Sequence, residues 1–252
     1  MIRFVLSSCL ALLLLVSNSA LAQWSTIKGK FTVVGDVPVL PPLPCAAVAG
    51  GPCCAKPVPD ESLVVSEKKE LANVFIYVRG QVANVNPALK AAVQPLVLDN
   101  VGCIFKPHAS ILWTEQKLEI NNKDNVGHNT NYGSALQGFN VLIAANGQDV
   151  RQLKAGENLP QNISCNIHPW MQAKLLVRDN PYFAVSATDG TFEIKDVPNN
   201  ALLEYQLWHE KTGYMGNLKF AGGIVDAKGR FKLTAAKDTD LGEIKVDTKV
   251  FK

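Results

Sequence analysis

The chain has 252 residues and a near-balanced charge, with 25 basic against 22 acidic side chains. It contains no run of basic residues, which argues against a nucleic-acid partner, and after residue 22 no segment is apolar for long enough to span a membrane. This length is enough for one large or two smaller domains.

Residues 1–22 have the pattern of a secretory signal peptide. Arg3 precedes an apolar run, and Ala20, Leu21 and Ala22 fit the small-x-small rule for cleavage. We therefore expect an exported chain that begins at Gln23 and works in the periplasm, outside the cell or on its surface. In such a compartment thiols tend to pair as disulfides.

The rest of the chain is expected to be all-β. Short segments with alternating or β-branched residues recur between turn residues, as in sandwiches and barrels. These segments are 27–34, 73–80, 117–122, 139–145, 173–179, 191–197, 202–208, 230–235 and 242–247. One short helix is expected after Pro87.

The pattern changes near residues 179–190, and this predicts two domains after the signal peptide. The first, 23–180, would include residues 38–59, which are rich in Pro, Ala, Gly and Cys. We expect these residues to form an irregular loop that is held by disulfides. The second domain, 181–252, would be a small β-sandwich.

Five cysteines follow the signal peptide, so one sulfur is left over if the others pair. The odd one is expected to be Cys165, because it alone has histidine and methionine close by. Two disulfides would then join Cys45, Cys53, Cys54 and Cys103. Three connectivities are open, although a bond between the adjacent Cys53 and Cys54 would be strained.

Cys165, His168 and Met171 lie three residues apart in the segment SCNIHPWMQAK. A type 1 copper site needs a thiolate, two imidazoles and a weak axial ligand that is often a methionine thioether. This loop would supply three of the four ligands. His128, which follows a predicted strand and turn, is the candidate for the fourth.

These two blocks resemble cupredoxins, the blue copper proteins, and most closely the amicyanin and plastocyanin type. The Cys-x2-His-x2-Met spacing with Pro169 after the histidine, and Asn129 after His128, carry the resemblance. It implies a Greek-key cupredoxin β-sandwich with one type 1 copper. It also implies that Asn129 hydrogen-bonds to the ligand loop.

The wider arrangement is similar to exported methylamine-utilisation-like proteins, which add a transthyretin-like, carboxypeptidase-regulatory-like β-sandwich. This resemblance implies a non-enzymatic carrier that passes single electrons between a donor and an acceptor protein. Pro169 and Trp170 would contribute to an apolar docking patch, unless Trp170 packs against the neighbouring sandwich instead. The second sandwich would be suited to carbohydrate or a surface protein.

Several alternatives stay open. The protein could carry copper without electron transfer, or be a structural or surface-binding β-sandwich in which Cys165 is disulfide-bonded. His108 could be a ligand of a second metal or replace His128, although a structural histidine bonded to backbone carbonyls is the simpler interpretation. His209 is adjacent to Glu210, and we interpret this pair as structural or interfacial.

Overall fold

The computed structural model describes residues 24–45, 53 and 56–251. The predicted signal peptide and Cys54 lie outside these residues. Within them, no helix is both long enough and apolar enough to cross a bilayer.

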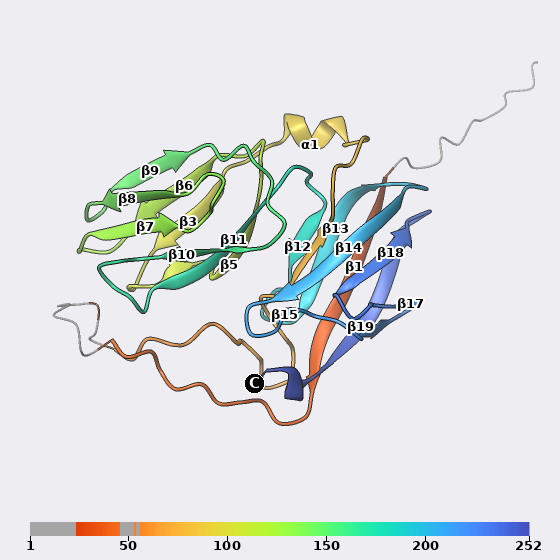
Figure 1. The fold of residues 1–252 in the computed structure, drawn as a ribbon, viewed down its shortest axis with the longest axis horizontal. Coiled ribbons are helices and arrows are strands. Elements are labelled where there is room, and N and C mark those ends of the chain that lie inside the picture. The colour runs from red at the N-terminus through yellow and green to blue at the C-terminus, as the bar shows by residue number, and fades with distance from the viewer. Residues whose placement is uncertain (1–23, 46–52, 54–55, 252) are drawn as a thin grey trace, which may run out of the picture.

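The described chain is all-β apart from two short helical segments, as predicted (Figure 1). Helix α1 (Pro87–Ala91) begins where Pro87 predicted a helix, and the side chain of Asn86 caps it by accepting a hydrogen bond from the Ala88 N–H. The second segment is a 3₁₀ turn, η2 (Thr248–Val250), near the C-terminus.

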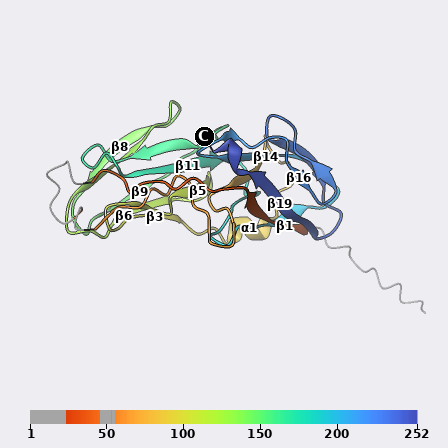
Figure 2. The same ribbon diagram turned by 90° about the horizontal axis from the view of Figure 1, so that it is seen from below.

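The strands form two lobes that lie side by side (Figures 1 and 2). We call the first the inserted lobe, because its strands are continuous in sequence and lie between strands of the other. It consists of β3 (Leu96–Asn100), β4 (Phe105–Lys106), β5 (Ala109–Trp113), β6 (Leu118–Asn122), β7 (His128–Tyr132), β8 (Phe139–Ile143), β9 (Gln148–Arg151), β10 (Gln161–Ser164) and β11 (Gln172–Arg178).

The inserted lobe contains two sheets, with strand orders β5-β11-β10-β7-β8 and β4-β3-β6-β9. Their side chains share one buried cluster, which includes Leu98, Ile120, Tyr132, Ile163 and Leu175. Buried side chains from both sheets in one cluster make this lobe a β-sandwich.

The second lobe, which we call the enclosing lobe, takes strands from both ends of the chain. It consists of β1 (Trp24–Val34), β2 (Phe75–Val78), β12 (Phe183–Val185), β13 (Thr191–Pro198), β14 (Leu202–His209), β15 (Gly213–Tyr214), β16 (Lys219–Phe220), β17 (Gly223–Ile224), β18 (Arg230–Thr234) and β19 (Thr239–Asp247). Its main sheets have the orders β13-β1-β19 and β12-β2-β14-β15, and β18 pairs with β14. The strands β16 and β17 form a separate hairpin.

This pairing corrects the predicted division of the chain at residue 180. Strand β1 pairs with β13 and β19, and β2 pairs with β12 and β14, so both early strands belong with the later part of the chain. The prediction drew each domain as one continuous segment. Strand pairing is not local in sequence, and a pattern of alternating residues does not say which strands are partners.

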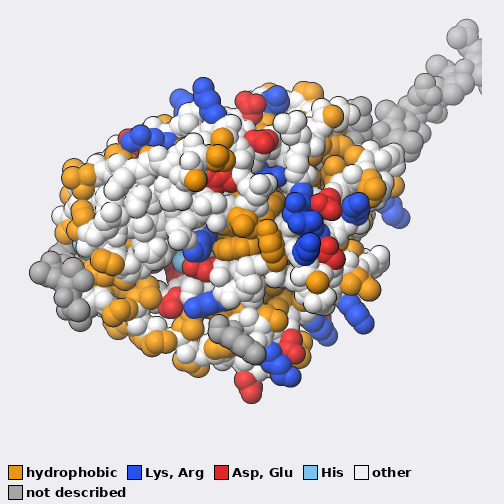
Figure 3. Space-filling model, viewed as in Figure 1, with side chains coloured by type: hydrophobic (Ala, Val, Ile, Leu, Met, Phe, Trp, Pro, Cys, Tyr) orange, Lys and Arg blue, Asp and Glu red, His pale blue; other side chains and the backbone are white. Residues whose placement is uncertain are grey.

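A separate buried cluster joins the lobes. Phe75 and Tyr77 on β2 pack against Ala109 and Ile111 on β5 and against Leu176 on β11. On the outside, Lys or Arg and Asp or Glu side chains are interspersed over the face shown in Figure 3. Such a mixed surface does not concentrate one sign of charge on this face.

Candidate metal centre

The sheet register brings the two predicted ligand blocks together. Strands β10 and β7 are antiparallel neighbours, with Ile163 opposite Tyr132 and Ser164 opposite Asn131. Because the strands run in opposite directions, the start of β7 lies beside the end of β10. This places His128 close to the loop that begins at Cys165.

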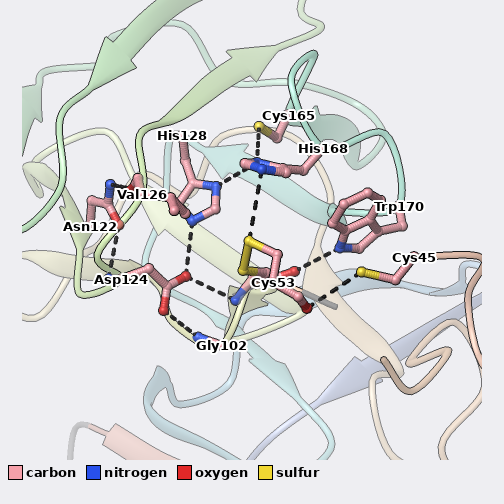
Figure 4. The surroundings of a disulfide bond; sticks show 11 residues. Cys45, Cys53, Gly102, Asn122, Asp124, Val126, His128, Cys165, His168 and Trp170 are labelled. Atoms are coloured by element: carbon pink, nitrogen blue, oxygen red, sulfur yellow. Dashed lines mark hydrogen bonds and ion pairs between the residues drawn. A yellow bond between two sulfur atoms is a disulfide. The ribbon is translucent and has the colours of Figure 1, made fainter. Parts of the chain in front are cut away.

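The two predicted histidine ligands face each other. Nδ1 of His128 lies 2.9 Å from Nδ1 of His168 (Figure 4). The other nitrogen of His128, Nε2, lies 2.9 Å from Oδ2 of Asp124 and donates to it, since an ionised carboxylate only accepts. The ring of His128 therefore turns its Nδ1 toward His168.

Cys165 completes the group of donors. Its Sγ lies 3.7 Å from Nδ1 of His168 and 3.3 Å from Oδ1 of Asn129. Cys165 is the free cysteine among the described residues and is 1% exposed. The pairing of the described cysteines thus agrees with the prediction that Cys165 is the odd one.

Backbone hydrogen bonds close the loop 165–171, which carries three of the candidate ligands. The N–H of Met171 donates to the carbonyl of His168 at 2.9 Å, and the N–H of Cys165 donates to the carbonyl of Met171 at 3.2 Å. The side chain of Met171 is fully buried in the same cluster as Cys165. Its role as the axial ligand remains a prediction.

Asn129 ties the two blocks together, as the resemblance implied. Its Oδ1 accepts the N–H of Asn166 at 2.7 Å and that of Ile167 at 3.2 Å. Its Nδ2 donates to Oδ1 of Asn140 at 2.7 Å on the neighbouring strand β8. One side chain therefore links β7, β8 and the loop after β10.

The donor set fits a soft or borderline metal ion. Nδ1 of His168 lies 2.9 Å from Nδ1 of His128 and 3.7 Å from Sγ of Cys165, so the two atoms of each pair are close enough to bind one ion at bonds of about 2.0–2.3 Å. Burial and the neighbouring His128 lower the pKa of His168, which favours the neutral, ligating ring. A thiol and two imidazoles are the donors that copper prefers at such a site.

The centre is covered by a disulfide that the sequence did not place there. Cys53 is bonded to Cys103, which excludes a bond between Cys53 and Cys54. Sγ of Cys53 lies 3.8 Å from Nε2 of His168. His168 is only 5% exposed. Cys45 is disulfide-bonded as well.

The predicted docking patch is wrong for one of its two residues. Trp170 is 6% exposed, its ring centre lies 5.2 Å from that of His168, and its Nε1 donates to the carbonyl of Cys103 at 3.1 Å. The indole is therefore a wall of the site, held by the disulfide-bonded segment. Pro169 is exposed, and so is Ile167.

The remaining histidines lie away from this centre. Nε2 of His108 lies 2.6 Å from Oε2 of Glu210, and Nζ of Lys174 lies 3.1 Å from Oε1 of the same carboxylate. His108 and Lys174 belong to the inserted lobe and Glu210 follows β14, so the three join the lobes. His108 thus agrees with the interpretation of a structural histidine, but its partner is a carboxylate and not a backbone carbonyl. His209 is buried beside Phe251.

The sequence patterns did not reveal Asp124 as a partner of the site. Besides His128, its carboxylate accepts the N–H of Gly102 at 2.7 Å and that of Cys103 at 2.9 Å. The signal that could have found it is the spacing, since Asp124 precedes His128 by four residues across the same turn.

Comparisons with known proteins give structural likeness over part of the chain. No protein-family model and no curated protein matches it. A mutant of amicyanin with Cu(I) is similar over 41% of this chain and 98% of its own, at 11% identity and a TM-score of 0.31. A second amicyanin mutant, in its reduced form, covers the same shares, at 12% identity and a TM-score of 0.31. A purple cupredoxin from Nitrosopumilus maritimus is similar over 32% of this chain and 97% of its own, at 15% identity and a TM-score of 0.28.

Proposed function

We propose that this protein is an exported type 1 copper protein that carries single electrons between redox partners. The observation that carries the proposal is the pair of close contacts made by Nδ1 of His168, which lies 2.9 Å from Nδ1 of His128 and 3.7 Å from Sγ of Cys165, with all three residues buried. A buried free thiol beside two imidazoles is the arrangement that a type 1 copper ion requires. Copper supplies one-electron chemistry between Cu(I) and Cu(II) when it is bound there.

The protein residues have distinct roles in this proposal. Cys165 would provide the thiolate, His128 and His168 would provide the imidazoles, and Met171 would provide a weak thioether donor. Asn129 holds the loop in register through Asn166 and Ile167. A fixed ligand set limits the rearrangement that accompanies electron transfer, and burial keeps water out.

The partners in this proposal are a donor and an acceptor protein that bind transiently. The exposed Ile167 and Pro169, next to the ligand His168, would contribute apolar contact surface. The periplasm or cell surface is the compartment that the predicted signal peptide and the Cys53–Cys103 disulfide support. Carbohydrate or surface-protein binding by the enclosing lobe remains a prediction that no observation here favours.

The test is the visible absorption spectrum of the mature protein with one equivalent of Cu(II). An intense thiolate-to-copper charge-transfer band is expected, and it should disappear in Cys165→Ser. A matched control is His108→Gln, which removes an imidazole that lies away from the site and should keep the band. A wild-type protein without the band would overturn the proposal.

One observation favours a second candidate, copper carriage without electron transfer. His168 is 5% exposed and lies under the Cys53–Cys103 disulfide and Trp170, so a partner does not reach its ring directly. Electron self-exchange between the Cu(I) and Cu(II) forms distinguishes the two candidates. Self-exchange can be followed by nuclear magnetic resonance in mixtures of the two forms. Line broadening that grows with protein concentration supports electron transfer, and the absence of such broadening supports carriage.

A further inference from the structure

His168 presents its two ring nitrogens to two different sulfur groups. Nδ1 faces the thiol of Cys165 at 3.7 Å, and Nε2 faces Sγ of Cys53 at 3.8 Å (Figure 4). Cys53 is in turn bonded to Cys103. The imidazole therefore stands between a thiol and a disulfide.

Both sulfurs of this disulfide lie among groups that bind metals. Donor atoms of Cys53, His128 and His168 all lie within 4.8 Å of one another, and the same holds for Cys103, Asp124 and His128. A sulfur in a disulfide is not a thiolate and is a poor ligand. The same two sulfurs, once reduced, are strong ligands for soft ions.

A cavity lies beside the disulfide, whose two residues Cys53 and Cys103 are 5% and 4% exposed. A pocket of about 350 Å³ is lined by Cys53 and Cys103 together with Lys56, Lys123 and Asp124. This volume admits a small dithiol or a copper complex.

We propose that reduction of the Cys53–Cys103 disulfide creates a second copper site, which is selective for Cu(I). Its ligands are the two thiolates and Nε2 of His168. The inference rests on the proposed function to the extent that His168 is shared with the type 1 centre. A neutral imidazole has one bare nitrogen, so His168 serves one of the two sites at a time, and the thiolate pair becomes a place where copper enters or leaves.

The reduction balances with a dithiol as the reductant. The dithiol gives two electrons and two protons to the S–S bond, which breaks into two thiols, and the dithiol itself closes to a cyclic disulfide. Binding of Cu(I) then displaces the two thiol protons, which pass to the solvent. Copper undergoes no change of oxidation state in this step.

The experiment uses Cys165→Ser, which lacks the type 1 thiolate, so that Cu(I) bound there is not counted. This protein is prepared in the disulfide form and, after dithiol treatment and anaerobic desalting, in the reduced form. Each is titrated against Cu(I) held by a coloured chelator. The reduced form is expected to take one equivalent of Cu(I) at least about tenfold more tightly than the disulfide form.

The matched control is the triple variant Cys53→Ser, Cys103→Ser, Cys165→Ser, reduced in the same way. It retains Cys45 and Cys54, so any difference from reduced Cys165→Ser comes from the Cys53 and Cys103 thiols. It also shows by circular dichroism whether the chain stays folded without this disulfide. Equal Cu(I) affinity in the two reduced proteins would overturn the proposal.

A further variant tests His168. Adding His168→Gln to Cys165→Ser keeps both thiolates but removes the imidazole, and X-ray absorption should then show copper–sulfur contacts without the copper–nitrogen contact. If the Cu(I) affinity and the X-ray absorption spectrum are both unchanged, the assignment of His168 is overturned. This comparison applies even if reduction loosens the fold, since both proteins are compared in the reduced form. A wild-type protein without a Cu(II) thiolate band would overturn the type 1 centre alone, because the Cu(I) titration does not use Cys165.

Discussion

Oδ2 of Asp124 lies 2.9 Å from Nε2 of His128, and the same carboxylate accepts the backbone N–H groups of Gly102 and Cys103. The side chain of Asp124 thus orients the proposed ligand His128 and anchors the turn that carries Cys103, one of the two disulfide-bonded cysteines. A carboxylate behind a ligating histidine fixes its tautomer and raises its basicity.

Asp124→Asn is therefore expected to weaken copper binding about 10- to 100-fold, because an amide orients His128 less strongly than a carboxylate does. Competition with a chelator measures this change. Asp99→Asn is the matched control, since the side chain of Asp99 contacts Lys123 and Asn121 and none of the four proposed ligands. Equal losses in the two variants would contradict the role of Asp124.

Asn129→Ala is expected to lower the free energy of unfolding of the metal-free protein by about 1–3 kcal/mol, because the N–H groups of Asn166 and Ile167 lose their acceptor. Urea unfolding measures it. Asn131→Ala is the control on the same strand, since the side chain of Asn131 makes one long contact of 3.4 Å with Asn166. In Asn131→Ala we expect a loss of less than about 0.5 kcal/mol. A similar loss in both variants would argue against the role of Asn129 in holding the loop.

Trp170 should report copper binding by its fluorescence. Its ring centre lies 5.2 Å from that of His168, close enough for bound Cu(II) to quench its emission. In Trp170→Phe the copper-dependent quenching should fall sharply, whereas in Trp208→Phe it should persist, because Trp208 packs on Phe75 at the junction of the lobes. Full quenching in Trp170→Phe would place copper elsewhere.

The buried His209 should make stability depend on pH. Burial lowers the pKa of His209 from 6.5 to about 4. Below pH 6.5 the unfolded chain binds a proton that the folded chain does not bind until about pH 4, so the free energy of unfolding falls as the pH drops through this range.

At pH 5 this contribution amounts to a loss of about 2 kcal/mol relative to pH 7.5. His209→Gln lacks the titrating group, so wild type should lose about 2 kcal/mol more than the variant between these two pH values. Urea unfolding at both pH values measures the difference. Equal losses in the two proteins would show that His209 is not the group responsible.

The sequence predicted much of the local structure, and it singled out Cys165, His128 and His168, which lie together in the candidate site. All nine predicted β segments overlap strands, and α1 begins at Pro87. Strand β5 was missed because all five of its residues are buried, so its pattern does not alternate. Periodicity identifies a strand only when one face meets solvent.

Within the candidate site, the spacing of Cys165, His168 and Met171 identified the loop, since candidate ligands on one short loop are visible in sequence. The tertiary structure alone gave the approach of His128 to His168, because it depends on the register of β7 against β10. The same is true of the cover formed by Cys53 and Cys103, which are separated by 50 residues.

The sequence by itself thus determined the all-β class, the short loop that carries Cys165, His168 and Met171, and the odd cysteine, because each depends on residue type and short-range spacing. The tertiary structure decided that β1 and β2 join the later strands, that Asp124 supports His128, and that Trp170 is buried. These contacts join segments that are far apart in the sequence, or residues on the two sides of a turn. Their formation depends on strand pairing and side-chain packing, which no local pattern encodes.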